Sequence, residues 1–165
     1  MSRSQVESAT VGLEQQLCTF LVRGLLFGVP VERVQEVLRF QEMTPVPLAP
    51  PVVRGLINLR GQIVTALDMR RLLAGDVELP DATTEAAEPM NVVMRLPDGV
   101  VSFLVDEIGD VLQVQDGQRE PPPVTLAGRI RDLVTAVYKL ENDLLLVLDT
   151  HRAAALSIGA EKHES

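Results

Sequence analysis

The sequence has no tryptophan, one tyrosine and four phenylalanines among its 165 residues, and its formal net charge is −8. Nucleic-acid-binding proteins use clustered basic side chains to neutralise phosphates and aromatic rings to stack on bases. This chain has few aromatic rings, and its net negative charge repels phosphates. The composition therefore excludes nucleic acid as a partner and disfavours an anionic membrane surface.

Cysteine and histidine are also scarce. Cys18 is the single cysteine, so no internal disulfide can form, and its apolar neighbours predict a small buried side chain. His151 and His163 show no metal-ligand spacing. Residues 1–10 lack the apolar core of a signal peptide, and no apolar run is long enough to span a membrane. We therefore expect a cytoplasmic protein without a metal or cofactor.

Catalytic motifs are absent as well: the sequence has no Gly-x-Ser-x-Gly elbow, no P-loop and no dinucleotide-binding glycine motif. Asp68, Asp106 and Asp149 each follow an apolar strand, where an acid and a base could be paired. Asp68 and Asp149 also stand where a helix N-cap is expected, and Asp106 begins a polar turn. We expect no enzyme, with a hydrolase using Asp68 and Asp149 as the alternative.

What the chain has in quantity is aliphatic residues, and they are arranged in two similar halves. The segment 34–39 is similar to 108–113, at an offset of 74 residues, and 55–68 is similar to 136–149, at an offset of 81. The additional residues of the second half follow the proline run at 121–123. Two copies are too few for a solenoid, so the repeat predicts two similar bodies packed together.

Each half predicts five short strands. The first half suggests strands at 17–22, 25–30 and 34–40, then a proline-rich crossing, then two strands joined across Arg60-Gly61. The second suggests strands at 92–96, 100–105 and 111–114, then the prolines at 121–123, then two strands joined across Asn142-Asp143. Proline lacks the amide donor of a central strand, so the proline runs are loops or edges. Short strands with little helix predict an all-β fold of two five-stranded barrels with short helices.

The expected organisation is a domain at 16–155 between a flexible N-terminal segment, 1–15, and a flexible C-terminal tail, 156–165. Its parts are given with approximate bounds. Half one covers about 16–75, an acidic connector about 76–89, and half two about 90–155. Whether strands are exchanged between the two bodies is left open by the sequence.

One difference between the halves concerns charge. At the equivalent hairpin turn the first half has Arg60-Gly61 and the second has the acidic segment 141–143. A guanidinium on a rigid hairpin tip suits recognition of carboxylates, although a solvated turn arginine is an equally good interpretation. Glu36 and its counterpart Asp110 are both acidic, so a shared structural role is an alternative to recognition.

The segment 50–63, Pro-Pro-Val-Val-Arg-Gly-Leu-Ile-Asn-Leu-Arg-Gly-Gln-Ile, closely resembles the signature of the CheW family. The segments 34–37 and 103–108 match its other recurrent blocks in the right order, and the resemblance covers roughly 16–155. It implies two SH3-like barrels and a non-catalytic adaptor. The partners implied are the cytoplasmic tip of methyl-accepting chemoreceptors and the regulatory domain of the histidine kinase CheA.

The resemblance also implies a receptor-binding groove between the barrels. The corresponding positions in this chain are Val34, Glu36, Gly55, Leu56, Leu59 and Arg60. A ligand-sensing barrel that holds a small acid through Arg60 is a further alternative. The pathway that the chain serves is left open.

Overall fold

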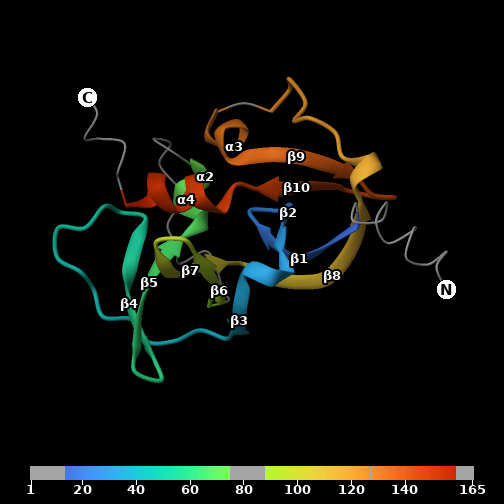
Figure 1. Ribbon diagram of the computed structural model, residues 1–165. Coiled ribbons are helices and arrows are strands. Elements are labelled where there is room, and N and C mark those ends of the chain that lie inside the picture. Colours follow the sequence, from blue (N-terminus) through green and yellow to red (C-terminus); the bar gives the residue numbers. More distant parts are fainter. Residues whose placement is uncertain (1–13, 75–87, 127, 159–165) are drawn as a thin grey trace, which may run out of the picture.

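The computed structural model describes residues 14–74, 88–126 and 128–158 (Figure 1). Most of the expected flexible ends and of the expected acidic connector lie outside the described residues, although a strand begins at Glu14 and a helix continues to Ser157. The strands are β1 (Glu14–Val22), β2 (Leu25–Pro30), β3 (Val34–Leu38), β4 (Val53–Leu59), β5 (Gln62–Asp68), β6 (Met90–Leu96), β7 (Gly99–Val105), β8 (Glu107–Gln115), β9 (Val134–Lys139) and β10 (Leu144–Leu148). The helical segments are η1 (Val31–Arg33), α2 (Met69–Ala74), η3 (Asp116–Gln118), α3 (Gly128–Leu133) and α4 (Thr150–Ser157).

The strands form two five-stranded sheets, which confirms the predicted all-β class with short helices. Sheet A has the order β8-β1-β2-β10-β9, and sheet B has the order β3-β6-β7-β5-β4. Each sheet thus takes strands from both halves of the sequence. Parallel pairs join the halves, β2 with β10 in sheet A and β5 with β7 in sheet B. Strands are therefore exchanged between the two bodies: each five-stranded sheet contains strands from both halves of the sequence.

The two sheets are copies of each other. When β1 to β5 are matched in order to β6 to β10, the strand order of sheet A becomes that of sheet B. The pairing register repeats as well: Cys18 opposes Val29, and Val92 opposes Phe103, 74 residues further on. Such agreement in register does not follow from chance similarity between aliphatic runs, because a slip of one residue would invert every side chain.

Three apolar clusters hold this arrangement together. One lies within sheet A and includes Val114 of β8 and Tyr138 of β9, which are the two edge strands. A second lies within sheet B and joins Leu38 of β3 to Ile57 of β4 in the same way. Each sheet therefore curls around its own interior, as in a small barrel.

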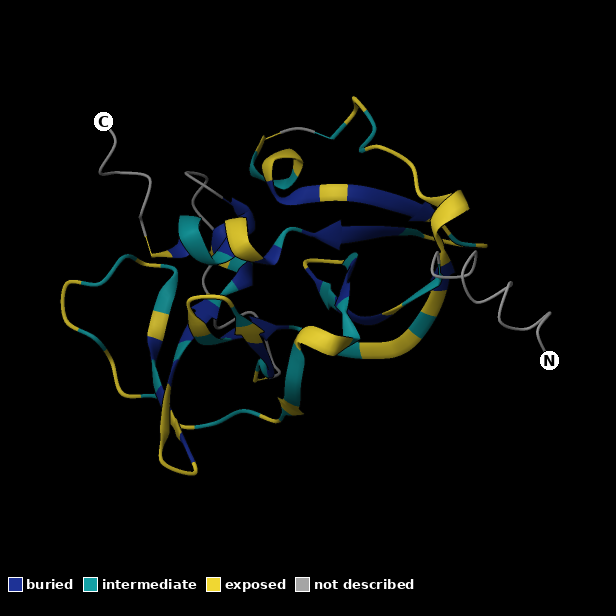
Figure 2. Cartoon of the chain, viewed as in Figure 1, coloured by how far each residue is buried: buried dark blue, intermediate teal, exposed yellow. Residues whose placement is uncertain are grey.

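The third and largest cluster packs between the sheets. Strand side chains alternate in direction, so neighbours on one strand belong to different clusters. In β10, Leu145 lies in the interior of sheet A and Leu146 lies in the central cluster. Most strands thus bury both faces, which explains their near-continuous apolar sequences. Figure 2 shows β9 and β10 largely buried, while β8, the hairpin tips and the connecting loops are largely exposed.

The expected strand boundaries hold at some ends and differ at others. The strand at 25–30 is found with those limits, and the third strand ends at Leu38 instead of residue 40. The strand expected at 111–114 is longer in the structure, where β8 spans Glu107–Gln115. Most of its exposed side chains are polar. Helix α3 was not expected and follows the additional residues of the second half.

Cys18 lies buried on β1, and burial raises the pKa of its thiol. The thiolate is the reactive form of cysteine, so the native protein should react very slowly with an aromatic disulfide reagent at neutral pH. Unfolding in guanidinium should release one reactive thiol per chain. Absorbance of the released thiol anion measures both states, and rapid labelling of the native protein would show that Cys18 is accessible.

Candidate docking surface

The turn between β4 and β5 presents Arg60 at its tip. Arg60 and Gly61 both have positive φ angles, 52° and 90°, as a two-residue hairpin turn of type I′ requires. The side chain of Asn58 accepts a hydrogen bond from the Gly61 amide at 2.9 Å, which fixes the turn. The tip is therefore well defined, and the Arg60 side chain is 70% exposed.

Glu36 and Arg60 form an ion pair. Glu36 lies on β3 and Arg60 follows β4, and these strands are the opposite edges of sheet B. A side-chain hydrogen bond from Gln35 of β3 to Gln62, 3.4 Å long, reaches the start of β5 on the other side of the β4–β5 turn. The curl of the sheet brings the two edges together. The Glu36 side chain is only 21% exposed, so the carboxylate backs the more exposed guanidinium.

Gly55 and Leu56 pack against the segment 40–44, which leaves the end of β3. Thr44 and Leu56 exchange two backbone hydrogen bonds, at 2.8 and 2.9 Å. A Cβ atom on Gly55 would lie 2.7 Å from the Thr44 carbonyl oxygen, so only glycine fits beneath this segment. Leu56 is partly exposed and lines a shallow hollow of about 740 Å³ between β4 and the segment 40–44.

Leu59 and Val34 have less contact with solvent than a docking role would suggest. Leu59 is only 6% exposed and belongs to the interior cluster of sheet B. Val34 is partly buried against the central cluster between the sheets. Of the six receptor-binding positions expected from the sequence, Glu36, Leu56 and Arg60 offer side chains at the surface, while Gly55, Leu59 and Val34 support them from beneath.

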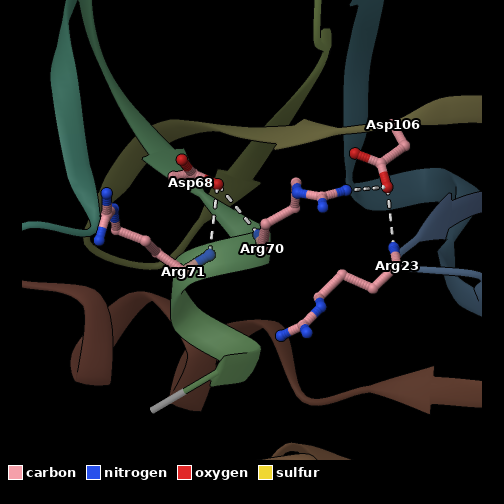
Figure 3. Close-up of polar contacts among 5 residues, drawn as sticks. All are labelled: Arg23, Asp68, Arg70, Arg71 and Asp106. Atoms are coloured by element: carbon pink, nitrogen blue, oxygen red, sulfur yellow. Dashed lines mark hydrogen bonds and ion pairs between the residues drawn. The ribbon is translucent and has the colours of Figure 1, made fainter. Parts of the chain in front are cut away.

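The three strand-end carboxylates have structural partners. Asp68 accepts hydrogen bonds from the amides of Arg70, at 3.0 Å, and Arg71, at 3.4 Å (Figure 3). It also pairs with Arg54 at 3.2 Å. Asp149 accepts from the Arg152 amide at 3.0 Å as the N-cap of α4. The expectation of helix caps is met.

Asp106 stands at the corner where the chain leaves β7 in sheet B and enters β8 in sheet A. One of its carboxylate oxygens accepts from the Arg23 amide at 2.8 Å and from the Arg70 guanidinium at 2.9 Å (Figure 3). Its own amide donates to the Leu21 carbonyl. This corner joins the β1–β2 turn, helix α2 and the crossing strand, so Asp106 acts in the fold and is not an unengaged acid.

The hydrolase alternative fails on the same geometry. Asp68 ends β5 and Asp149 directly follows β10, and these are equivalent strands in different sheets. Each caps its own helix, so their placement is symmetric instead of convergent on one cleft. Among residues 14–74, 88–126 and 128–158, no three metal-ligating side chains gather, and no helix is long and apolar enough to cross a membrane.

Exposed aliphatic side chains near the edges were missed by the sequence reasoning. Val37 on β3 is 37% exposed and Val111 on β8 is 56% exposed, and these two positions are equivalent in the duplication. Ile63 is exposed beside the Arg60 turn. The sequence aligns Val37 with Val111 at the offset of 74, but only the sheet order shows that each lies on an edge strand.

The surface offers an exposed ion pair, a shallow hollow beside it and scattered apolar side chains. The strand-end carboxylates are used in helix caps and at the corner between the sheets. These features define a protein-interaction module. Comparison with known proteins agrees. A family model described as the CheW-like domain matches residues 16–156. The chain belongs to the CheW family, and it is a non-catalytic adaptor of chemotaxis-type signalling.

Individual relatives are similar over most of their length. Chemotaxis protein CheW of Treponema pallidum is 27% identical over 140 residues, which cover 83% of this chain and 80% of that protein. Chemotaxis protein CheW of Bacillus subtilis is 28% identical over 145 residues, covering 87% and 89%. The crystal structure of the scaffolding protein TtCheW from Thermoanaerobacter tengcongensis superposes with a TM-score of 0.69 at 19% identity, covering 82% of this chain and 88% of that one. This last similarity concerns the fold.

Proposed function

We propose that this chain links the cytoplasmic tip of a chemoreceptor to the regulatory domain of a CheA-type histidine kinase, in the cytoplasm. The observation that carries the proposal is the family match over residues 16–156, combined with an exposed ion pair at the edge of sheet B. Two similar sheets give the molecule two separate surfaces, which a bridging protein needs. In an adaptor of this kind each contact has a modest affinity, and many simultaneous contacts within an assembly raise the overall affinity.

The receptor-facing surface in this proposal consists of Glu36, Arg60 and Leu56. Arg60 uses one guanidinium nitrogen for Glu36, so its other donors are available to a carboxylate of a partner. Leu56 contributes an apolar side chain to the neighbouring hollow, whose lining is mixed polar and apolar. A helix with an apolar stripe and an acidic residue would match this combination.

Three further positions shape this surface. Gly55 lets the segment 40–44 lie against β4, and Leu59 fills the interior behind the Arg60 turn. Val34 anchors the start of β3 against the central cluster. Substitutions at these positions would therefore act on binding through the shape of the surface.

Reconstitution tests the proposed function. The purified chain is mixed with CheA and with receptor-containing membranes from the same organism, and autophosphorylation of the kinase is measured with and without attractant. Kinase activity that responds to attractant only when the chain is present supports the coupling role. Kinase and receptor that respond equally without the chain, or a chain that sediments with neither, would contradict it.

A further inference from the structure

A second hollow lies far from the Arg60 turn in the sequence and is lined by basic side chains. It has a volume of about 340 Å³ and lies where the η1 crossing and the β6–β7 turn meet the start of α4. Arg33, Arg119 and His151 line it, together with the uncharged polar residues Gln15 and Thr135. Three separate elements thus bring groups that can carry positive charge to one place.

Arg33 and Arg119 are the two arginines that line this hollow, and their guanidinium groups are not engaged by a carboxylate of the described residues. Arg54, Arg60 and Arg70 each form an ion pair with a carboxylate. Arg33 and Arg119 form none with the residues that the structure describes. Two guanidinium groups without a carboxylate partner in the described part of the chain therefore line one hollow, where their donors are available to a ligand.

One carboxylate also lines the hollow, and it has another role. Asp149 accepts the hydrogen bond from the Arg152 amide that caps α4. Its carboxylate is therefore held at the helix terminus, and it offsets only part of the positive charge contributed by Arg33 and Arg119. Two guanidinium groups at one hollow favour an oxyanion with several oxygen atoms, because each guanidinium can bind an oxyanion through two parallel hydrogen bonds.

We propose that this hollow binds a small oxyanion carrying at least two negative charges, such as inorganic phosphate or a short tricarboxylate. Arg33 and Arg119 would hold its oxygen atoms and His151 would donate a further hydrogen bond. The volume is at the lower end of the range found for small-molecule sites, roughly 300–1,000 Å³, which suits an ion of this size.

The hollow lies between segments that belong to both sheets. Arg33 belongs to the crossing from sheet A to sheet B, and Pro97 belongs to a turn of sheet B. Arg119, Thr135 and His151 belong to segments next to sheet A. An ion held between them would contact both sheets, so its binding should raise the melting temperature of the whole domain by mass action.

The test uses the ring protons of His151, because the chain has only two histidines. In a His163→Gln variant, the remaining imidazole resonance reports on the hollow alone. The protein is titrated with sodium phosphate and, separately, with sodium citrate, at fixed pH and ionic strength, and acetate serves as the singly charged control. A saturable shift with one polyvalent ion, and a raised melting temperature with the same ion, is the expected result.

Matched variants separate a built site from general charge attraction. Arg33→Gln and Arg119→Gln should each weaken binding by about tenfold, the effect of one charge-assisted hydrogen bond. Arg39→Gln removes an equally exposed arginine that does not line the hollow, and it should leave the titration unchanged. Shifts that do not saturate, that acetate reproduces, or that survive in the Arg33→Gln/Arg119→Gln double variant would overturn the proposal. Neither receptor nor kinase is needed, so the outcome is independent of the proposed coupling role.

Discussion

Arg60→Glu is expected to weaken binding of a chemoreceptor cytoplasmic fragment by at least about tenfold while leaving the melting temperature nearly unchanged. The stability should hold because an ion pair with one partner this exposed contributes at most about 1 kcal/mol. The binding should fall because the variant places a second carboxylate beside Glu36, where the proposal requires a guanidinium. Titration calorimetry and thermal denaturation of the same samples give the two quantities.

The control is a second arginine in the same local structure. Arg23 and Gly24 form the β1–β2 turn with φ angles of 53° and 81°, close to those of Arg60 and Gly61. Its side chain is exposed, so Arg23→Glu makes the same change of charge on an equivalent hairpin tip. Equal loss of binding in Arg23→Glu would mean that net charge, and not the position of Arg60, governs the interaction.

Variants that change or exchange the charges of Glu36 and Arg60 separate a role of Glu36 in partner binding from a role in the stability of the fold. Glu36→Lys alone should weaken binding, and a matching loss of stability would indicate the structural role that it could share with Asp110. The double variant Glu36→Arg/Arg60→Glu restores an ion pair with opposite polarity. Recovery of stability without recovery of binding is expected if the partner needs a guanidinium at the turn. Recovery of both would show that only the closure of the sheet edges matters.

The local hairpins could be predicted from the sequence, and the assignment of strands to sheets could not. β1 and β2, or β6 and β7, are adjacent in sequence and joined by tight turns, so their pairing follows from short-range signals. The sheets depend instead on two short crossings, at Val31–Arg33 and at Asp106, that carry the chain from one sheet to the other. Nothing in the local pattern distinguishes a crossing from an ordinary turn.

The features of the candidate surface also divide into those that could be predicted from the sequence and those that could not. Arg60 could be found because the two halves differ in charge at that turn, and the family signature pointed to Glu36. Their direct contact depends on the curl of sheet B, which is a property of the whole sheet. The inward direction of Leu59 could have been inferred from the alternation of Ile57 and Leu59 with exposed Asn58. It was obscured because Leu56, on the opposite face of β4, is also apolar.

Gly55→Ala is expected to lower the free energy of unfolding by about 1–3 kcal/mol, the usual cost of forcing an extra methyl group into a packed site. The added Cβ would lie 2.7 Å from the Thr44 carbonyl oxygen and 2.9 Å from the Met43 Cβ. The first of these neighbours is backbone, so the segment 40–44 must shift and the two hydrogen bonds between Thr44 and Leu56 must weaken. Urea denaturation measures the change.

Gly117→Ala provides the matched control, because no atom lies within 4 Å of the Cβ position at Gly117 and its φ is not left-handed. Its free energy of unfolding should change by only a few tenths of a kcal/mol. The decisive comparison is receptor-fragment binding at a temperature where both variants are fully folded. If Gly55 acts through the surface that it shapes, folded Gly55→Ala binds more weakly than Gly117→Ala. Equal stability of the two variants would show that the segment 40–44 does not lie against β4, and the proposed surface would then lose its apolar part.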